Sequence, residues 1–233
     1  MNTEKFIKEV EKLNIKVTDQ QLKDLETYKN LLIEYNQKFN LTAIKTEEEI
    51  YLKHFYDSLT LIKGINLEGK KKLLDIGTGA GFPGLVLKIF YPELETTLLD
   101  SNHKKILFLE TVKKELNLKN ITCLNSRAEN LPKEYREYFD IVTSRAVAEL
   151  RILCELSIPY LKVGGKFIAM KGTLKEEIND SVKILEKLNS KIIDIKKFNL
   201  PIEDSNRSLI VIEKQKETSE LYPRSYDKIM KNR

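Results

Sequence analysis

Hydrophobic and polar positions follow two patterns along the chain, and the change between them falls near Gly69. Before that point the spacing is helical. Thr18 and Gln21 fit a capping box, and a mostly apolar face follows at intervals of three and four residues. Its positions are Leu22, Leu25, Lys29, Leu32 and Asn36. The pattern predicts a long helix after Thr18.

A second capping box, formed by Thr46 and Glu49, lies further along the same region. It opens a segment that is expected to be helical through about Ile62. Residues 1–69 therefore predict an N-terminal helical extension that precedes the main domain.

From residue 70 onward, short apolar runs alternate with stretches of helical spacing. Seven runs have the length and composition of strands: 71–76, 95–100, 120–125, 139–144, 165–171, a region near 191–198, and 207–213. Helical spacing between most of them, as at 104–116 and 174–188, favours βαβ units and a parallel sheet covered on both faces. The last two runs are joined only by a loop with Pro201, which favours an antiparallel hairpin at one edge. An α/β domain is expected over 70–214, with a tail at 215–233.

The segment LLDIGTGAGFPG, residues 73–84, carries four of the nine glycines directly after the first predicted strand. Glycine is favoured where the backbone turns left-handed or approaches another group closely. In an open parallel sheet, ligands bind at the carboxyl ends of the strands, and a glycine-rich first turn lets backbone N–H groups approach them. A nucleotide-like ligand is therefore expected at Gly77 and Gly79, with a helix running from Phe82 until Pro92 closes it.

Asp100 ends the second predicted strand, 23 residues after Gly77. A carboxylate there can accept hydrogen bonds from a ribose diol, and the alternative is a helix cap or a solvated acid. The dinucleotide fingerprint GxGxxG fails because Phe82 occupies the position of its third glycine. The pattern GxGxG preceded by Asp75 is instead similar to S-adenosylmethionine-dependent methyltransferases, and the strand count with a terminal hairpin agrees with that superfamily.

Composition and charge exclude further classes of protein. The longest run without charged residues is far shorter than the ~20 apolar residues of a membrane span, and the N-terminus lacks the pattern of a signal peptide, so a cytoplasmic protein is expected. Cys123 and Cys154 form no CxxC pair, and His54 and His103 have no cysteine nearby, so free thiols and no metal site are expected. The net charge is +5, and the twenty residues from Lys214 contribute six basic and three acidic groups. This tail is either a solubilising segment or a phosphate-contacting arm.

Six stretches, in this order, resemble the bacterial small-subunit ribosomal RNA guanine-N7 methyltransferase family, also called glucose-inhibited division protein B. They are YKNLLIEYNQKFNLTAI (28–44), HFYDSL (54–59), DIGTGAGFPGL (75–85), LLDSNHKKILFL (98–109), DIVTSRAVAEL (140–150) and AMKG (169–172). The resemblance implies a Rossmann-like seven-stranded class I methyltransferase sheet. It also implies transfer of a methyl group from S-adenosyl-L-methionine to N7 of one guanine in the decoding region of 16S rRNA. The expected partner is 16S rRNA or the small ribosomal subunit, and a monomer is expected.

The cofactor contacts of that family fall by position on five residues, to which the turn and the second strand add Gly79 and Asp100. The predicted cofactor-binding set is Gly77, Gly79, Phe82, Asp100, Ala128, Glu129 and Arg145. Ala128 and Glu129 follow the third predicted strand, beyond which an adenine ring would lie. Arg145 follows the fourth strand at the mouth of the same cleft, unless it only pairs with Glu149. The Phe82 ring either closes over the ligand or faces the core.

Guanine N7 carries a lone pair and no proton, so methyl transfer to it requires no general base, and no catalytic residue is named. Candidate phosphate contacts are Lys171 and the tail from Arg224 to Arg233. The tail departs from the family, because YPR at 222–224 is followed by SYDKIMKNR, which lacks the expected glycine.

Two alternative functions are a non-catalytic rRNA-binding assembly factor on a methyltransferase fold and a small-molecule methyltransferase. The intact GTGAGFPG turn and Asp100 count against the first alternative. The basic tail and the family resemblance count against the second.

Overall fold

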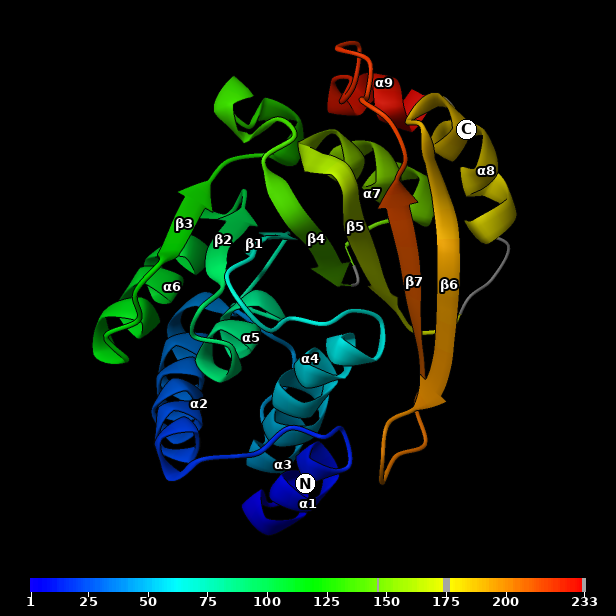
Figure 1. Ribbon diagram of the computed structural model, residues 1–233. Coiled ribbons are helices and arrows are strands. Elements are labelled where there is room, and N and C mark those ends of the chain that lie inside the picture. The colour runs from blue at the N-terminus through cyan, green and yellow to red at the C-terminus, as the bar shows by residue number, and fades with distance from the viewer. Residues whose placement is uncertain (146, 174–176, 232–233) are drawn as a thin grey trace.

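The computed structural model describes residues 1–145, 147–173 and 177–231, which form a seven-stranded sheet with helices on both faces (Figure 1). The strands are β1 (Lys72–Ile76), β2 (Glu95–Asp100), β3 (Ile121–Asn125), β4 (Phe139–Arg145), β5 (Leu161–Lys171), β6 (Ser190–Asn199) and β7 (Asn206–Lys214). Their order is β3-β2-β1-β4-β5-β7-β6, and the first five are parallel. β7 is antiparallel to both of its neighbours, so the predicted edge hairpin is confirmed.

The order of the strands reverses between β1 and β4, which are neighbours in the sheet although two strands separate them in the chain. In open α/β sheets, ligands bind outside the carboxyl ends of the strands at such a switch point. The glycine turn after β1 and the Arg145 end of β4 both lie at this position. The topology therefore places the predicted site residues together at the carboxyl ends of the central strands.

The N-terminal region forms α1 (Thr3–Glu11), α2 (Asp19–Phe39), α3 (Glu47–Glu49) and α4 (Asp57–Leu59), with a π-helical turn at Ile50–Tyr56 and a 3₁₀ turn at Thr60–Lys63. The predicted capping box of α2 is present: Gln21 N donates to Thr18 Oγ1 over 3.2 Å, and Thr18 N donates to Gln21 Oε1 over 2.9 Å. The Thr46 side chain accepts from Glu49 N at the start of α3. Both predicted helix starts are confirmed.

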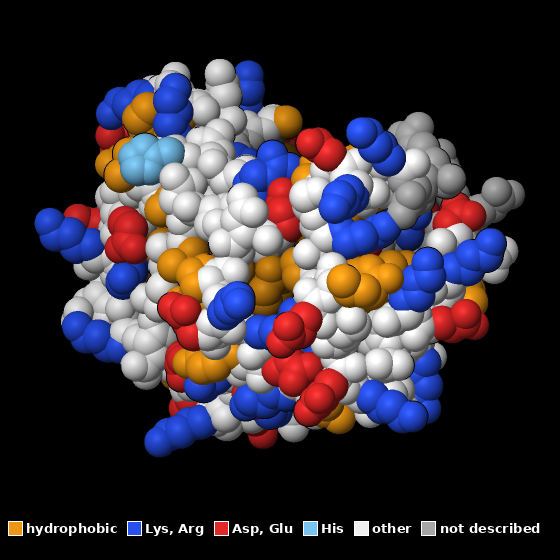
Figure 2. Space-filling view, turned by 90° about the horizontal axis from the view of Figure 1, so that it is seen from above, with side chains coloured by type: hydrophobic (Ala, Val, Ile, Leu, Met, Phe, Trp, Pro, Cys, Tyr) orange, Lys and Arg blue, Asp and Glu red, His pale blue; other side chains and the backbone are white. Residues whose placement is uncertain are grey.

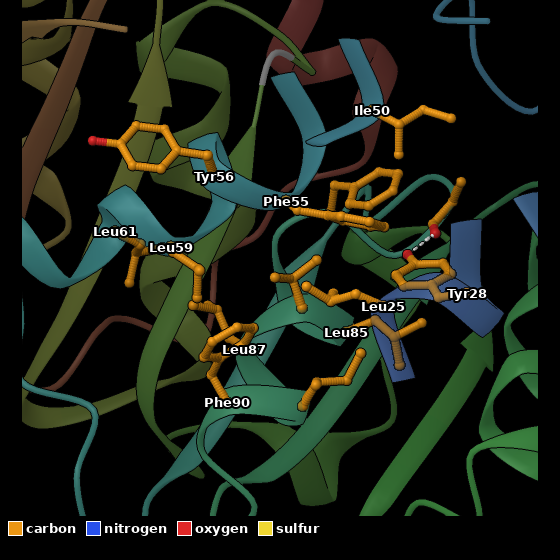
Figure 3. Packing of buried hydrophobic residues seen from close by; sticks show 14 of the residues in the cluster. Leu25, Tyr28, Ile50, Phe55, Tyr56, Leu59, Leu61, Leu85, Leu87 and Phe90 are labelled. Carbon is orange, nitrogen blue, oxygen red and sulfur yellow. Dashed lines mark hydrogen bonds between the residues drawn. The ribbon is translucent and has the colours of Figure 1, made fainter. Parts of the chain in front are cut away.

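These N-terminal helices pack on α5 (Gly84–Phe90), which follows the glycine turn. Figure 3 shows Leu25 and Tyr28 of α2 beside Leu85 of α5, with Phe55 above them. The Tyr28 hydroxyl donates to the carbonyl of Ala80 within the turn, as the dashed line in Figure 3 marks. The helical extension and the sheet domain therefore share one core. The division of the chain into two domains at residue 69 stays a prediction.

α5 begins two residues later than predicted. The sequence pattern placed the helix start at Phe82, but Pro83 occupies the N-cap position and the first helical residue is Gly84. Proline has no backbone N–H to donate and is tolerated only at the start of a helix, so the helix begins after Pro83 and does not include Phe82. α5 ends at Phe90, ahead of Pro92.

The remaining helices are α6 (His103–Glu115), α7 (Leu150–Ser157), α8 (Glu177–Lys187) and α9 (Tyr226–Lys231). Successive strand residues point to opposite faces. Leu73 accordingly packs in the core of the N-terminal helices, α5 and α6, whereas Leu74 packs in a second core with α7. The first three residues of the predicted helix at 174–188 lie outside the described residues, and the rest of it is confirmed as α8.

Cys123 and Cys154 are free thiols, as predicted, and burial raises the pKa of both. Within the described ranges, no helix has the length and apolar character needed to cross a membrane.

Candidate active site

Asp75, the last but one residue of β1, stabilises the glycine turn through hydrogen bonds. Its side chain is fully buried, and Oδ2 accepts hydrogen bonds from Thr78 Oγ1 and from the backbone N–H of Gly84, both over 2.7 Å. The carboxylate thus ties the start of the turn to the start of α5. Burial raises the pKa of Asp75 to about 6, although its hydrogen bonds act in the opposite direction.

Three glycines of this turn have a positive φ, which is 69° at Gly77, 62° at Gly79 and 103° at Gly81. Non-glycine residues rarely adopt this region. A Cβ at Gly77 would also lie 2.6 Å from Cγ2 of Val147, whereas a Cβ at Gly79 would have open space around it. The turn therefore requires glycine at Gly77 for both conformation and space.

Asp100, at the end of β2, binds the same turn. Its Oδ2 accepts the Gly79 N–H over 2.9 Å, and its Oδ1 accepts the N–H of Asn102, the N-cap residue of α6, over 2.8 Å. Asp100 thus has a structural role, but it is neither of the alternatives that the sequence left open, because Asn102 caps α6 and the Asp100 side chain is buried. Nζ of Lys105 also lies 3.6 Å from Oδ2, beyond hydrogen-bond distance. A carboxylate has about four acceptor positions, so each oxygen retains a lone pair that no hydrogen bond occupies.

A cleft of about 490 Å³ opens at the carboxyl ends of the parallel strands. Five of the seven residues predicted to bind the cofactor line it: Gly77, Asp100, Ala128, Glu129 and Arg145. Gly79 does not line the cleft itself, but its N–H is hydrogen-bonded to Asp100, which does. Phe82 faces the core, where its ring stacks on that of His54 with a centroid distance of 4.0 Å and on that of Tyr28 at 5.5 Å. The structure therefore gathers six of the seven residues around the cleft and leaves the Phe82 side chain outside its wall.

One end of the cleft is built by the 3₁₀ turn Ala128–Asn130 after β3. The carbonyl of Ala128 accepts from the Tyr160 hydroxyl, and the Glu129 carboxylate accepts from Arg127 Nε over 2.6 Å. The guanidinium of Arg127 lies over the ring of Tyr226, 4.5 Å from its centroid, and Tyr226 also lines the cleft.

Tyr226 is a site residue that sequence reasoning missed. It lies in α9, where the chain departs from the family pattern, so the resemblance carries no residue to this position. Periodicity cannot find it either, because it reaches the cleft only when the tail folds back against α7. The tail is held there in part by Arg136, which donates to the carbonyls of Tyr222, Thr218 and Ser219.

Arg145 is held by the HFYDSL segment and not by Glu149, which pairs with Arg151. Its Nη1 donates to the carbonyl of Lys53 over 2.9 Å and lies 3.3 Å from Asp57 Oδ2. These partners lie about ninety positions earlier in the sequence, so local spacing gave no indication of them.

The tautomer of His54 follows from its contact with Arg145. Nη2 of Arg145 lies 3.2 Å from Nδ1 of His54, and a guanidinium can only donate, so Nδ1 accepts. The proton therefore sits on Nε2, which donates to Thr42 Oγ1 over 2.9 Å. Burial and the positive charge of Arg145 lower the pKa of His54 to about 3, so the imidazole is neutral.

Two residues predicted to contact phosphates have partners within the protein. Arg224 donates from its backbone N–H and from Nε and Nη2 to Glu155, whose side chain is only 1% exposed. Lys171 donates to the carbonyl of Ala148 and lies 2.8 Å from Glu177. Both cations therefore stabilise the fold around α7. Across residues 1–145, 147–173 and 177–231, no cluster of three or more His, Cys, Asp or Glu is placed to hold a metal ion.

The chain is similar to known proteins along nearly its whole length. A family model described as rRNA small subunit methyltransferase G matches residues 21–209. The ribosomal RNA small subunit methyltransferase G of Acetivibrio thermocellus is 48% identical over 223 residues, which cover 94% of this chain and 90% of that protein. The protein of the same name from Streptococcus pneumoniae is 46% identical over 228 residues, or 96% of each chain. A solved structure of a SAM-dependent methyltransferase from Aquifex aeolicus shares the fold, with a TM-score of 0.52 and 17% identity over 72% of this chain and 94% of that one.

Proposed function

Because the chain belongs to the rRNA small subunit methyltransferase G family, we propose that it transfers a methyl group from S-adenosyl-L-methionine to N7 of one guanine in the decoding region of 16S ribosomal RNA. The observation that carries this proposal is the cleft at the carboxyl ends of β1 to β4, which unites a glycine turn, an acidic strand end and Arg145. It lies at the switch point of the sheet, where this fold class binds its ligands.

The cleft fits S-adenosylmethionine in its chemistry. Gly77 lets the backbone of the turn face the amino-acid end of the cofactor, since its φ of 69° and the nearby Val147 leave no place for a side chain there. Asp100 has lone pairs for the ribose hydroxyls, and Ala128 with Glu129 would border the adenine. The cofactor supplies an electrophilic methyl carbon on a positively charged sulfur.

The chain's own residues act by positioning. N7 of guanine attacks with a lone pair and loses no proton, so the site needs no general base. His54 agrees with this mechanism, because it is neutral, both of its nitrogens are hydrogen-bonded, and its pKa of about 3 makes it a poor base. Holding nucleophile and methyl carbon in line within a site shielded from water supplies the catalysis.

The proposed partner is 16S rRNA, either naked or in the small subunit, and the proposed setting is the bacterial cytoplasm, with the protein acting as a monomer. The net charge of +5 favours a polyanionic partner. Figure 2 shows a face of the molecule on which Lys and Arg side chains are interspersed with Asp and Glu. RNA binding on that face would therefore depend on individual basic groups and not on a uniform positive field.

The proposal is tested by offering labelled S-adenosylmethionine with three acceptors: 16S rRNA, assembled small subunits and a metabolite extract. We expect label in RNA or subunits and none in the extract. A calorimetric titration with the cofactor separates the alternatives. Cofactor binding without transfer to any acceptor would support the non-catalytic assembly factor, and label in the extract alone would support a small-molecule methyltransferase.

A further inference from the structure

We propose that a second cavity beside Arg145 receives the unpaired guanine that accepts the methyl group, and that Arg207 recognises O6 of this base. The inference rests on the proposed function and identifies the acceptor side of the same site. Arg207, Asp57 and Phe198 lie outside the predicted cofactor-binding set, whereas Arg145 belongs to it.

The cavity lies next to the cofactor cleft. The cavity has a volume of about 380 Å³ and lies between the HFYDSL segment and the ends of β5, β6 and β7. Arg145 lines both this cavity and the cofactor cleft, so the two spaces lie on either side of one residue. A volume in the range of about 300 to 1,000 Å³ is typical of small-molecule sites. A base in one space and a cofactor in the other would therefore be neighbours across Arg145.

The walls of the cavity suit a flat heteroaromatic ring. Ile44, Met170, Phe198 and Leu209 contribute apolar surface. The polar lining includes Asp57, Arg145 and Arg207, together with Lys53, His54, Thr60, Lys171 and Ser208. Proteins that read single-stranded RNA stack unpaired bases on aromatic side chains and bind their edges with polar groups. Two rings are in the described lining: His54 already stacks on Phe82, and Phe198 has Lys63 Nζ 5.2 Å from its centroid, so stacking of a base falls to the other face of Phe198.

Arg207 of β7 has the donor that guanine requires. Its Nε donates to Asp57 Oδ1 over 3.0 Å, and its Nη1 donates to the carbonyl of Asn206 over 2.9 Å. Among the residues that the structure describes, none accepts a hydrogen bond from Nη2. The side chain is 22% exposed, so this nitrogen belongs to a group that is held in place yet accessible from the cavity.

A donor at this place distinguishes purines. Guanine presents O6, an acceptor, where adenine presents an amino group that donates. Arginine commonly binds O6 and N7 of guanine together, but the methylated nitrogen must keep its lone pair free. Because Nε and Nη1 of Arg207 are engaged by Asp57 and Asn206, Nη2 can bind O6 and leave N7 to the cofactor.

Asp57 fixes the two arginines relative to each other. Its Oδ2 lies 3.3 Å from Nη1 of Arg145, its Oδ1 accepts from Arg207, and its side chain is 5% exposed. A buried carboxylate that is paired on both oxygens constrains both guanidinium groups. Asp57 is therefore a positioning residue that couples the wall of the cofactor cleft to the proposed O6 donor.

The cavity also has a route for the flanking RNA. Phe198, Arg207 and Ser208 line both this cavity and an adjoining one, to which Lys197 and Asn199 contribute polar groups. A base in a polynucleotide enters with its sugar and phosphates, so its site needs a polar approach. The hairpin of β6 and β7 provides that approach.

The test is a pair of variants measured on two RNAs. Arg207→Met removes the donor, and Lys196→Gln removes an exposed basic group of β6 as the matched control. The substrates are 16S rRNA with guanine at the accepting position and the same RNA with 2-aminopurine there, which keeps N7 and lacks O6. For the parent protein, we expect 2-aminopurine to lower kcat/KM about 10- to 100-fold, the range for losing one good base contact.

For Arg207→Met, we expect a similar 10- to 100-fold loss on guanine and almost no further loss on 2-aminopurine, because the two changes remove the same contact. Its dissociation constant for S-adenosylmethionine should stay within twofold of the parent value, and Lys196→Gln should match the parent throughout. If Arg207→Met does not fold, Arg207→Lys, which keeps a cation beside Asp57, takes its place in the experiment. It should show the same loss of discrimination between guanine and 2-aminopurine.

Two results overturn the inference: full activity of the Arg207 variants on guanine, or variants that discriminate guanine from 2-aminopurine as strongly as the parent does. Failure of the proposed function would be visible separately, because the parent protein would then methylate neither RNA.

Discussion

The backbone N–H of Gly79 donates to Oδ2 of Asp100 over 2.9 Å, which joins the glycine turn after β1 to the end of β2. The sequence assigned both residues to the cofactor, but it gave no indication that they bind each other. The contact means that Asp100 shapes the turn and also presents its remaining lone pairs to the cleft. A change at Asp100 therefore acts on two walls of the site.

Replacing Asp100 with alanine should weaken binding of S-adenosylmethionine by about 2 to 3 kcal/mol, the range for hydrogen bonds to a charged group. Asp100→Asn should recover only part of this loss, because its single amide oxygen replaces two carboxylate oxygens that now serve Gly79 and Asn102. Calorimetric titration of both variants measures the effect. If both variants bind the cofactor like the parent, Asp100 has only its structural role.

Tyr226→Ala should weaken cofactor binding by about 1 kcal/mol, because the ring that borders the Ala128 end of the cleft is lost. Tyr226→Phe keeps the ring over Arg127 and should bind nearly as well as the parent. The same titration compares the two. Equal affinities for the alanine and phenylalanine variants would remove Tyr226 from the cofactor site.

The cations of the tail should separate into two kinds. Arg224→Gln leaves the buried Glu155 without its cation and should destabilise the fold by about 2 to 4 kcal/mol, since breaking a buried ion pair is strongly destabilising and Arg224 is partly exposed. The exposed Lys228 and Lys231 should contribute within about 0.5 kcal/mol to stability. Thermal unfolding of the variants measures this difference, and equal stability of all three would contradict it.

If Lys228 and Lys231 contact RNA, replacing both with glutamine should reduce the slope of log K against log salt by up to about 0.7 to 0.9 per contact. Cofactor affinity should remain constant in this variant. Filter binding at several salt concentrations gives the slope. An unchanged slope would exclude these two lysines from the RNA interface.

Asp75 should make stability depend on pH. Its pKa is about 6 in the fold against 3.8 for the free group. The folded state thus binds the proton more tightly, and the contribution of this group to stability falls as pH rises from about 4 to about 6. The loss is about 3 kcal/mol across that window. Asp75→Asn should flatten this part of the curve in denaturant unfolding, and an unchanged pH dependence in that variant would contradict the burial of the charge.

Local sequence signals predict most of the fold. The capping box at Thr18 and the apolar strand runs depend on neighbouring residues, so their pattern is visible in the chain itself. The glycine turn was readable for the same reason.

The features of the site that the sequence did not predict depend on contacts between segments far apart in the chain. Asp57 reaches Arg145 and Arg207 from 88 and 150 positions away, and the Arg224 to Glu155 pair spans 69. Helical or strand periodicity carries no information about such pairs. The direction of the Phe82 ring was undecided for the same reason, because it depends on His54 and Tyr28 in the N-terminal helices.

The most direct test of the account is to map the methyl group in the RNA product. Methylation of guanine at N7 places a positive charge on the ring and makes the base removable by borohydride and aniline, which cleaves the chain at that nucleotide. After incubation of 16S rRNA or small subunits with the protein and S-adenosylmethionine, we predict cleavage at one guanine in the decoding region, dependent on both protein and cofactor. Incorporated label without aniline cleavage, or cleavage at many guanines, would contradict transfer to N7 of a single guanine.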